Sequence, residues 1–158
     1  MAAPTPTARG TPSGYSLKDG FRSLITLSHN TTISLWEISV KPIGADGGDA
    51  IDQTTMHNVT YMTKAPQRLI DLTDGSFKFA YDPAVKATIL AELNREQTFT
   101  QLFSDGSTEA VFGFLKSVEF DELVKGTRPE GTAVFVPTNW DPTNKVEAGP
   151  VVTSVSGT

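Results

Sequence analysis

The sequence predicts a mainly β protein, built as a β-sandwich or partly closed barrel with one α-helix at about residues 83–96. Three observations lead to this fold class. Segments in which apolar and polar residues alternate recur along the chain, one segment carries helix-capping signals, and residues 97–137 are typical of a long β-hairpin. A strand as long as the second arm of this hairpin either bends at a bulge or extends to a neighbouring molecule.

Composition places the chain among globular proteins of one domain. Its 158 residues, 38% of them hydrophobic, suffice for a core in residues 21–140, while Pro- and Gly-rich stretches predict an N-terminal arm over 1–20 and a C-terminal arm over 141–158. No cysteine is present, which excludes disulfides and thiolate metal ligands. The net charge of −5 has the wrong sign for gripping phosphates, so tight nucleic-acid binding is disfavoured.

Membrane and secretion signals are missing from the sequence. No apolar run approaches the length of a bilayer span, and residues 1–14 lack the apolar core of a signal peptide. We therefore expect synthesis in the cytoplasm and no membrane anchor. The Asn-X-Thr triplets that begin at Asn30 and Asn58 match the glycosylation pattern, but without a secretion signal we interpret them as chance occurrences.

The first half of the domain predicts strands separated by one long loop. Residues 22–28 and 33–41, rich in β-branched and aromatic residues, predict a hairpin. Residues 42–56 form a polar, Gly-rich connection that is longer than most in compact domains, which is typical of a functional or mobile loop. Further strands are predicted at 57–63, 67–72 and 75–81.

A helix is predicted directly after these strands. Asp82 can cap its N-terminus, Pro83 suits the first helical position, and residues 84–96 favour helix throughout. The stripe expected to pack on the sheet consists of Val85, Ile89, Leu90 and Leu93. Farther along the chain, residues 132–137 predict the closing strand.

The long hairpin is the most informative segment of the chain. A strand at 97–103, an Asp-Gly turn and a return strand at about 108–124 follow one another. The predicted apolar face of the return strand consists of Phe112, Phe114, Val118 and Phe120. Lys116 would fall on this apolar face, so we expect a bulge near Gly113 or Ser117 to shift the register.

Side chains that could carry catalysis or bind a metal are few. The two histidines, His29 and His57, are not spaced as zinc ligands are. Ser16 lacks the spacing of a nucleophile elbow. Three acidic residues in the long loop have a spacing that does not fit a calcium site, namely Asp46, Asp49 and Asp52.

Two carboxylates remain as candidates for acid and base. Glu119 and Asp121 lie on one face of the predicted strand about 7 Å apart. Glycosidase carboxylates face each other across a cleft, however, and no further residue completes such a site. We therefore interpret the pair as part of a charged solvent or channel face, and we predict no catalytic residue, no metal site, no cofactor and no enzymatic activity.

Five short motifs follow one another in a characteristic order around the predicted helix. In chain order they are 52–57 (DQTTMH), 69–83 (LIDLTDGSFKFAYDP), 103–107 (FSDGS), 112–120 (FGFLKSVEF) and 131–139 (GTAVFVPTN). Their order resembles that of the major tail tube proteins of long-tailed (siphovirus-type) bacteriophages over roughly residues 20–140. Residues 59–66 depart from this pattern, because the family often has a Gly-rich stretch after the Thr-Thr pair.

The resemblance implies a virion structural protein. Proteins of this family form hexameric rings in which the long strands of six subunits close into one β-barrel, and stacked rings make the tail tube through which DNA is ejected. For this chain the resemblance implies a homo-hexamer in stacked rings, with tape measure, tail terminator and distal tail proteins as further partners. It also implies passage of DNA without specific binding, and a location in the virion tail after assembly in the host cytoplasm.

The resemblance also suggests roles for individual residues. We expect carboxylates of the long strand to face the lumen and repel DNA, namely Glu109, Glu119 and Asp121. We expect the loop over 42–56 to contact the next ring and to become ordered there. The loop residues with this expected role include Ile43, Asp46, Asp49 and Ile51.

Other classes of function remain open at this point. A β-sandwich carbohydrate- or ligand-binding module would have a similar number of strands, and it would expose Trp36, Tyr61 or Trp140 on one concave face. A small hydrolase would need a nucleophile, a base and an acid that the sequence does not bring together. A distal tail protein or a capsid-decorating subunit would belong to the same structural class as a tail tube protein.

Overall fold

The computed structural model describes residues 23–33, 35–103 and 106–154. The predicted N-terminal arm over 1–20 lies outside the described residues, as do Asp105 of the hairpin turn and the end of the predicted C-terminal arm. Within the described residues, no helix is long and apolar enough to cross a membrane.

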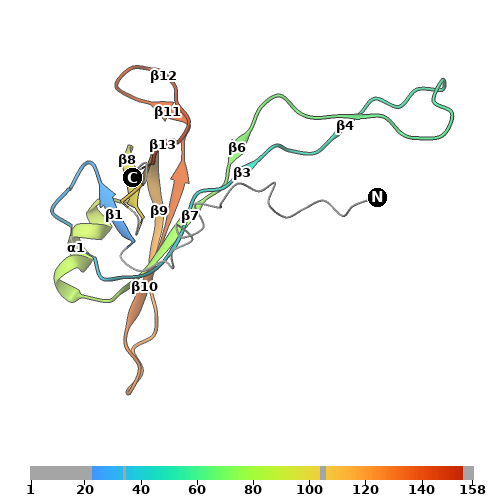
Figure 1. The fold of residues 1–158 in the computed structure, drawn as a ribbon. Coiled ribbons are helices and arrows are strands. Elements are labelled where there is room, and N and C mark those ends of the chain that lie inside the picture. Colours follow the sequence, from blue (N-terminus) through green and yellow to red (C-terminus); the bar gives the residue numbers. More distant parts are fainter. Residues whose placement is uncertain (1–22, 34, 104–105, 155–158) are drawn as a thin grey trace, which may run out of the picture.

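One antiparallel sheet of seven strands forms the body of the protein (Figure 1). Its main path runs through β1 (Leu24–Leu27), β8 (Gln97–Leu102), β9 (Thr108–Phe120), β10 (Glu130–Pro137), β7 (Gly75–Ala80) and β2 (Glu37–Lys41). The seventh strand, β13 (Val151–Thr153), pairs with the beginning of β9, on the side that β10 occupies farther along. The predicted fold class, mainly β with one helix, is confirmed.

The sheet rolls up, so that its two ends approach each other. The backbone N–H of Ile25 in β1 donates to Glu37 Oε1 in β2 at 3.0 Å, although β8, β9, β10 and β7 separate these strands in the sheet. The rings of Phe77 in β7 and Phe99 in β8 lie 5.7 Å apart across the interior. The core enclosed in this way consists of Ile25, Leu27, Phe77, Phe79, Ile89, Phe99, Val111, Leu115, Ala133 and Phe135.

The helix α1 (Pro83–Ala91) covers one side of this core with Ile89. It begins as predicted, because Asp82 Oδ1 accepts a hydrogen bond from the backbone N–H of Ala84 at 2.9 Å. Pro83 occupies the first helical position, where a missing N–H costs nothing.

The helix ends at Ala91, so the predicted end at 96 is wrong. Asn94 adopts a positive φ of 58°, a conformation that asparagine tolerates better than most residues. Its backbone N–H donates to the Leu115 carbonyl of β9 at 3.0 Å. This tertiary hydrogen bond takes the place of another helical turn and directs the chain into β8.

β1 and β2 do not pair with each other, so the hairpin predicted over 22–28 and 33–41 is wrong. β1 pairs with β8, and β2 pairs with β7. Alternation identifies which side of a strand faces the core, but it does not identify the neighbouring strand. Leu27 pairs with Phe99 of β8, and this register buries both side chains.

Residues 42–74 leave the sheet as a long two-stranded arm (Figure 1). Its short ladders join β3 (Ala45–Asp46) to β6 (Asp71–Leu72) and β4 (Ile51–Asp52) to β5 (Lys64–Ala65). The predicted loop over 42–56 is one side of this arm. The strand predicted at 57–63 is wrong, and only the end of the one predicted at 67–72 forms. A two-stranded ribbon has no second layer on which to bury alternate side chains, so long ladders are not favoured there.

The expected bulge lies in the long strand at Lys116. Val134 of β10 pairs with Ser117, and the next residue, Phe135, pairs with Leu115. Lys116 therefore has no partner in β10 and is the extra residue of the bulge. The predicted long strand is confirmed, since β9 has 13 residues.

The bulge reverses which alternate side chains of β9 face the core. Before it, Val111 is buried, and after it, Val118 and Phe120 pack against the core. The prediction that Phe112 and Phe114 share a face with Val118 and Phe120 is therefore wrong. The strand also ends earlier than the predicted 124.

Part of the predicted C-terminal arm folds against the body. β11 (Trp140–Asp141) pairs with β12 (Val146–Glu147), and β13 joins the sheet. In the turn between β11 and β12, the Asp141 carboxylate accepts hydrogen bonds from the Asn144 side chain at 2.6 Å and from the Thr143 N–H at 2.8 Å. The hydrogen bond from Asn144 lowers the pKa of Asp141, which favours the ionised acceptor.

The close approach of β9 and β10 leaves no room for a methyl group at Gly113. A Cβ there would lie 2.2 Å from the Val136 carbonyl oxygen and 2.6 Å from the Phe135 ring. We expect Gly113→Ala to lower the free energy of unfolding by roughly 1–3 kcal/mol in chemical denaturation. Gly47→Ala is the matched control, because nothing lies within 4 Å of a Cβ at Gly47. Equal effects of the two substitutions would contradict this account of the packing.

Candidate functional site

The titratable side chains form no evident chemical centre. In the described part of the chain, no group of three or more His, Cys, Asp or Glu side chains is placed to hold a metal ion. His29 Nδ1 lies 3.1 Å from Glu92 Oε1, and its Nε2 lies 2.7 Å from Arg95 Nη1. Glu92 is buried, and Gln97 lies 3.4 Å from its other oxygen. These contacts join the end of α1 to β1 and β8 and give His29 a structural role.

The longest strand has an edge that the described part of the chain leaves partly unpaired. On one side, β10 pairs with β9 from Gly113 to Phe120. On the other side, β8 reaches only Gly113, and the last contact is the hydrogen bond from Asn94 to the Leu115 carbonyl. Among the described residues, no strand pairs with 116–120 on that side. This segment is an open β edge.

Backbone groups at this edge point away from β10. The Asp121 N–H donates to the Glu130 carbonyl at 2.9 Å, so this pair is a hydrogen-bonded one. Hydrogen-bonded and non-hydrogen-bonded pairs alternate along an antiparallel ladder. The N–H and C=O groups of Val118 and Phe120 therefore point outward, where another strand could bind them.

A second edge lies on the opposite side of the same section of sheet. The distal half of β9 is followed by β10, β7 and β2, and β2 is the last strand of this path. β2 forms a ladder with β7, and its contact with β1 is the hydrogen bond from the Ile25 backbone N–H to the Glu37 side chain. We call these four strands the edge-bounded section.

Ion pairs cover the face of the edge-bounded section that points away from the core. Lys78 Nζ lies 2.7 Å from Glu130 Oε2 and 3.6 Å from Asp121 Oδ2, and Arg128 lies 3.1 Å from Glu130 Oε1. The hydrogen bond between Lys78 and Glu130 raises the pKa of Lys78 and lowers that of Glu130. Glu119 is exposed on the same face, with no ion pair to the residues that the structure describes.

Glu109 does not lie on this face. It precedes the bulge and points to the same side of β9 as the buried Val111. Burial raises the pKa of its carboxyl group. The prediction that Glu109 shares a face with Glu119 and Asp121 is wrong, because the extra residue at Lys116 changes the alternation between them.

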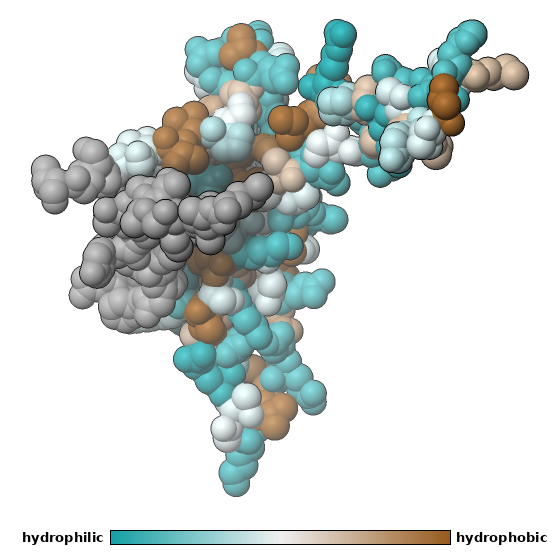
Figure 2. Space-filling view, turned by 45° about the vertical axis from the view of Figure 1, so that its right-hand side comes forward, coloured by the Kyte–Doolittle hydropathy of each residue, from teal (hydrophilic) through white to brown (hydrophobic). Residues whose placement is uncertain are grey.

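The tip of the arm, residues 53–63, turns polar groups inward and apolar side chains outward. The Asn58 side chain accepts a hydrogen bond from the Thr55 N–H at 2.8 Å and donates one to Thr63 Oγ1 at 2.8 Å. The apolar side chains that point into solvent there are Met56 (102% exposed), Val59 (97%), Tyr61 (82%) and Met62 (65%). Figure 2 shows hydrophobic surface at the far end of the arm, among hydrophilic side chains. An ordered tip of this kind is typical of a surface that binds another molecule.

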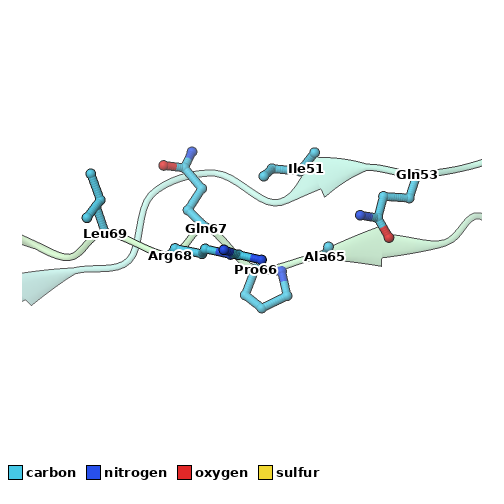
Figure 3. Close-up of a pocket in the computed structure, with 7 residues that line it drawn as sticks. All are labelled: Ile51, Gln53, Ala65, Pro66, Gln67, Arg68 and Leu69. Carbon is cyan, nitrogen blue, oxygen red and sulfur yellow. The ribbon is translucent and has the colours of Figure 1, made fainter.

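The middle of the arm is hollowed over about 530 Å³ (Figure 3). The residues that line it come from both runs of the arm and are Ile51, Gln53, Ala65, Pro66, Gln67, Arg68 and Leu69. Gln67 Nε2 donates to the Asp49 carbonyl at 3.0 Å and so links the two runs. Gly48 has a positive φ of 74°, and a Cβ there would lie 2.7 Å from the Gln67 side chain. A glycine is therefore required beside this link.

The loop residues expected to contact a next ring are spread along one side of the arm. Ile43 lies at its base, partly buried against the core. Asp46 accepts a hydrogen bond from the Gly48 N–H at 2.9 Å, which stabilises a turn. Asp49 contributes its carbonyl to the link across the arm. Ile51 lines the hollow and is exposed, so it is the one of the four that offers an apolar contact surface.

The aromatic side chains that a ligand-binding module would bring together lie on separate elements. Trp36 precedes β2, Tyr61 lies in the tip of the arm, and Trp140 begins β11. All three are exposed. In the described ranges, no ring contact joins any two of them. They do not form the shared concave face expected of such a module.

The exposure of residues 67–72 on the arm was not predicted from the sequence. A signal was present, since Leu69 and Ile70 are adjacent in a segment interpreted as a strand. Neighbouring residues of a strand point to opposite faces, so both can be buried only in a strand covered on two sides. In the structure, these side chains are 80% and 66% exposed.

Comparison with known proteins gives a likeness of fold. No family model matches the sequence, and no curated protein matches it either. Among solved structures, the chain is similar to one in the cryo-EM structure of the anti-feeding prophage (AFP) baseplate, 6-fold symmetrised, with a TM-score of 0.57. The match covers 85% of this chain and 92% of that chain at 5% identity. At this identity the likeness concerns the fold, which is matched over most of both chains.

The half-buried Glu109 makes stability depend on pH. Because burial raises its pKa in the folded protein, its ionisation costs stability as the pH rises through the folded pKa, whereas below the unfolded pKa no cost arises. We expect Glu109→Gln to raise the melting temperature at pH 7 and to leave it nearly unchanged at pH 3, as measured by circular dichroism. Glu119→Gln removes the same charge from an exposed position and is the control. A gain for Glu109→Gln that is as large at pH 3 as at pH 7 would rule out this cause.

Proposed function

We propose that this chain is a virion structural protein that assembles into stacked hexameric rings, which form the phage tail tube through which DNA is ejected. The observation that carries the proposal is the open edge of β9 over 116–120. An exposed β edge binds other strands, and closure into a barrel removes such edges altogether. The order of the sequence motifs, which resembles that of tail tube proteins, supports the same conclusion.

The geometry of the two edges favours a ring. Pairing of the β9 edge of one copy with the β2 edge of the next joins two different surfaces, so the contact is heterologous. Heterologous contacts generate a closed ring when the rotation between copies closes. The edge-bounded sections of all copies then become one continuous barrel. The fold likeness to a chain of a 6-fold symmetrised assembly supports six copies in the ring.

In such a ring, the face with the ion pairs lines the lumen, and Glu119 and Asp121 supply carboxylates there. Lys78 is bound by Glu130 and Asp121, so its charge is matched by carboxylates and attracts phosphates less. A lumen of this kind lets DNA pass without holding it. Glu109 lies on the core side of its strand and has no place in this proposed lumen.

The arm over 42–74 is the proposed contact with the next ring. Burial of its apolar tip against another copy removes this surface from water. The hydrogen bonds of Asn58 hold the tip in shape before contact, which reduces the entropy lost on binding. Tape measure, tail terminator and distal tail proteins are further proposed partners of the rings, and the virion tail is the proposed location.

A ring of a tail baseplate is the second candidate, because the similar solved chain belongs to a baseplate. Such a ring would use the same lateral edges but would not stack on copies of itself. Rings without tubes under all conditions would favour this candidate. A ligand-bound monomer would instead favour a β-sandwich binding module.

The lateral contact can be tested with engineered cysteines, because the chain has none of its own. Ser39 in β2 and Ser117 in β9 lie at the two edges, both on the face away from the core. For the double variant Ser39→Cys and Ser117→Cys, we expect short bismaleimide crosslinkers to give a ladder of products on denaturing gels that ends at the hexamer. The single variants are controls and should give no ladder. A ladder that stops at the dimer would contradict heterologous pairing.

Shortening the arm should separate ring formation from stacking. The Gln53 N–H donates to the Thr63 carbonyl at 2.8 Å, so Asn-Gly in place of residues 54–62 can close the shortened arm. We expect this variant to keep its melting temperature and its lateral crosslinks, and to form rings but no tubes in negative-stain electron microscopy. Tubes of wild-type length would show that the tip is not needed for stacking.

A further inference from the structure

Two exposed apolar surfaces are used neither by the lateral edges nor by the tip of the arm. The first is the end of the β9–β10 hairpin, residues 121–129, where Leu123 is 69% and Val124 is 53% exposed. We call it the hairpin end. The second is a hollow of about 480 Å³ at the base of the arm, which we call the base groove. Its apolar lining consists of Ala45, Leu69, Ile70, Leu72 and Pro150.

The two surfaces lie at opposite ends of β10. Glu130, the first residue of β10, directly follows the hairpin end, whereas Asn139, just beyond Pro137 at the other end, lines the base groove. The eight residues of β10 span roughly 26 Å. Figure 1 shows the hairpin end and the β11–β12 turn at opposite extremes of the body. One molecule therefore cannot place its own hairpin end in its own base groove, and a contact between them must join two molecules.

The charges beside these surfaces are complementary. Glu122 precedes the apolar pair of the hairpin end, and Lys125 follows it. The base groove is lined by Arg68 and Glu147 as well. None of these four side chains takes part in an ion pair with the residues that the structure describes. Opposite charges meet in a single orientation, with Glu122 at Arg68 and Lys125 at Glu147.

We propose that the hairpin end of one copy inserts Leu123 and Val124 into the base groove of a second copy. This inference rests on the proposed function and names a contact between successive rings. Each copy carries both surfaces at opposite ends of β10, so repetition of the contact places successive copies along the direction of β10. A second copy is the partner because both halves of the contact, with matching charges, are exposed on this one chain.

Crosslinking of two single-cysteine preparations tests the contact directly. Val124→Cys lies in the hairpin end, and Gly149→Cys lies in the base groove, where nothing is within 4 Å of a new Cβ. On mixing and oxidation, we expect several-fold more disulfide-linked heterodimer than in a control mixture of Val124→Cys with Leu90→Cys on α1. Equal yields in the two mixtures would overturn the inference. The assay needs no preformed tubes.

A charge exchange tests the orientation in assembled tubes. We expect Lys125→Glu, which would then face Glu147, to shorten the tubes roughly tenfold in electron micrographs. Glu147→Lys alone should do the same, and the two substitutions together should restore the length. Circular dichroism confirms that each variant is folded. If the double variant stays as short as the single ones, the proposed pairing of these charges is excluded.

The outcomes distinguish this inference from the proposed function. If tubes form but the specific crosslink does not, the hairpin-end contact is excluded and the proposed tail tube is not. If the specific crosslink forms but rings never do, the proposed tail tube is excluded and the contact between copies is supported.

Discussion

The open edge of this protein depends on a difference in length, since β9 is longer than any strand that pairs with it. The ladder between β8 and β9 ends at Gly113, because the chain enters β8 directly after the end of α1. At that point the Asn94 N–H donates to the Leu115 carbonyl of β9. β10 continues to Phe120 on the other side. Backbone groups that lose a partner must be solvated or must bind another strand. The distal half of β9 is thus open because of the lengths and turns of its neighbours, and no special side chain is needed to create the edge.

The bulge at Lys116 divides β9 into two halves with different roles. The first half, paired on both sides over much of its length, presents Val111 to the core and holds Glu109 half-buried on that side. The second half presents Val118 to the core and carries Glu119 on the opposite face. A strand without the bulge would place Glu119 toward the core, where an unpaired charge is costly. Because of this one extra residue, β9 contributes apolar side chains to the core on both sides of the bulge and still carries charged side chains on its outer face.

Sequence patterns predicted those features of the fold that depend on neighbouring residues in the chain. The alternation around Phe112, the Asp-Gly turn and the cap at Asp82 identified the long hairpin and the start of the helix, and Lys116 on an apolar face indicated the bulge. Partner choice could not be predicted, because β1 and β2 are short and their patterns fit several neighbours. The pairing of residues 42–56 with the following segment in one arm was also missed, since it depends on links such as that from Gln67 to Asp49, which join residues distant in sequence. Of the three carboxylates expected on one face of the long strand, Glu119 and Asp121 share a face and Glu109 does not, because the face depends on which side of the bulge each carboxylate lies.

Open edges and exposed apolar side chains raise the question of how single copies avoid uncontrolled association. Features at both edges weaken this association. A bulge and the exposed Lys116 stand at the start of the β9 edge, and both devices blunt edge pairing. On the β2 side, the Glu37 carboxylate already binds the Ile25 N–H, and the net charge of −5 repels other copies. A single contact is therefore weak. In the proposed ring, the last copy to join would gain two contacts at once, and this difference would favour complete rings over partial ones.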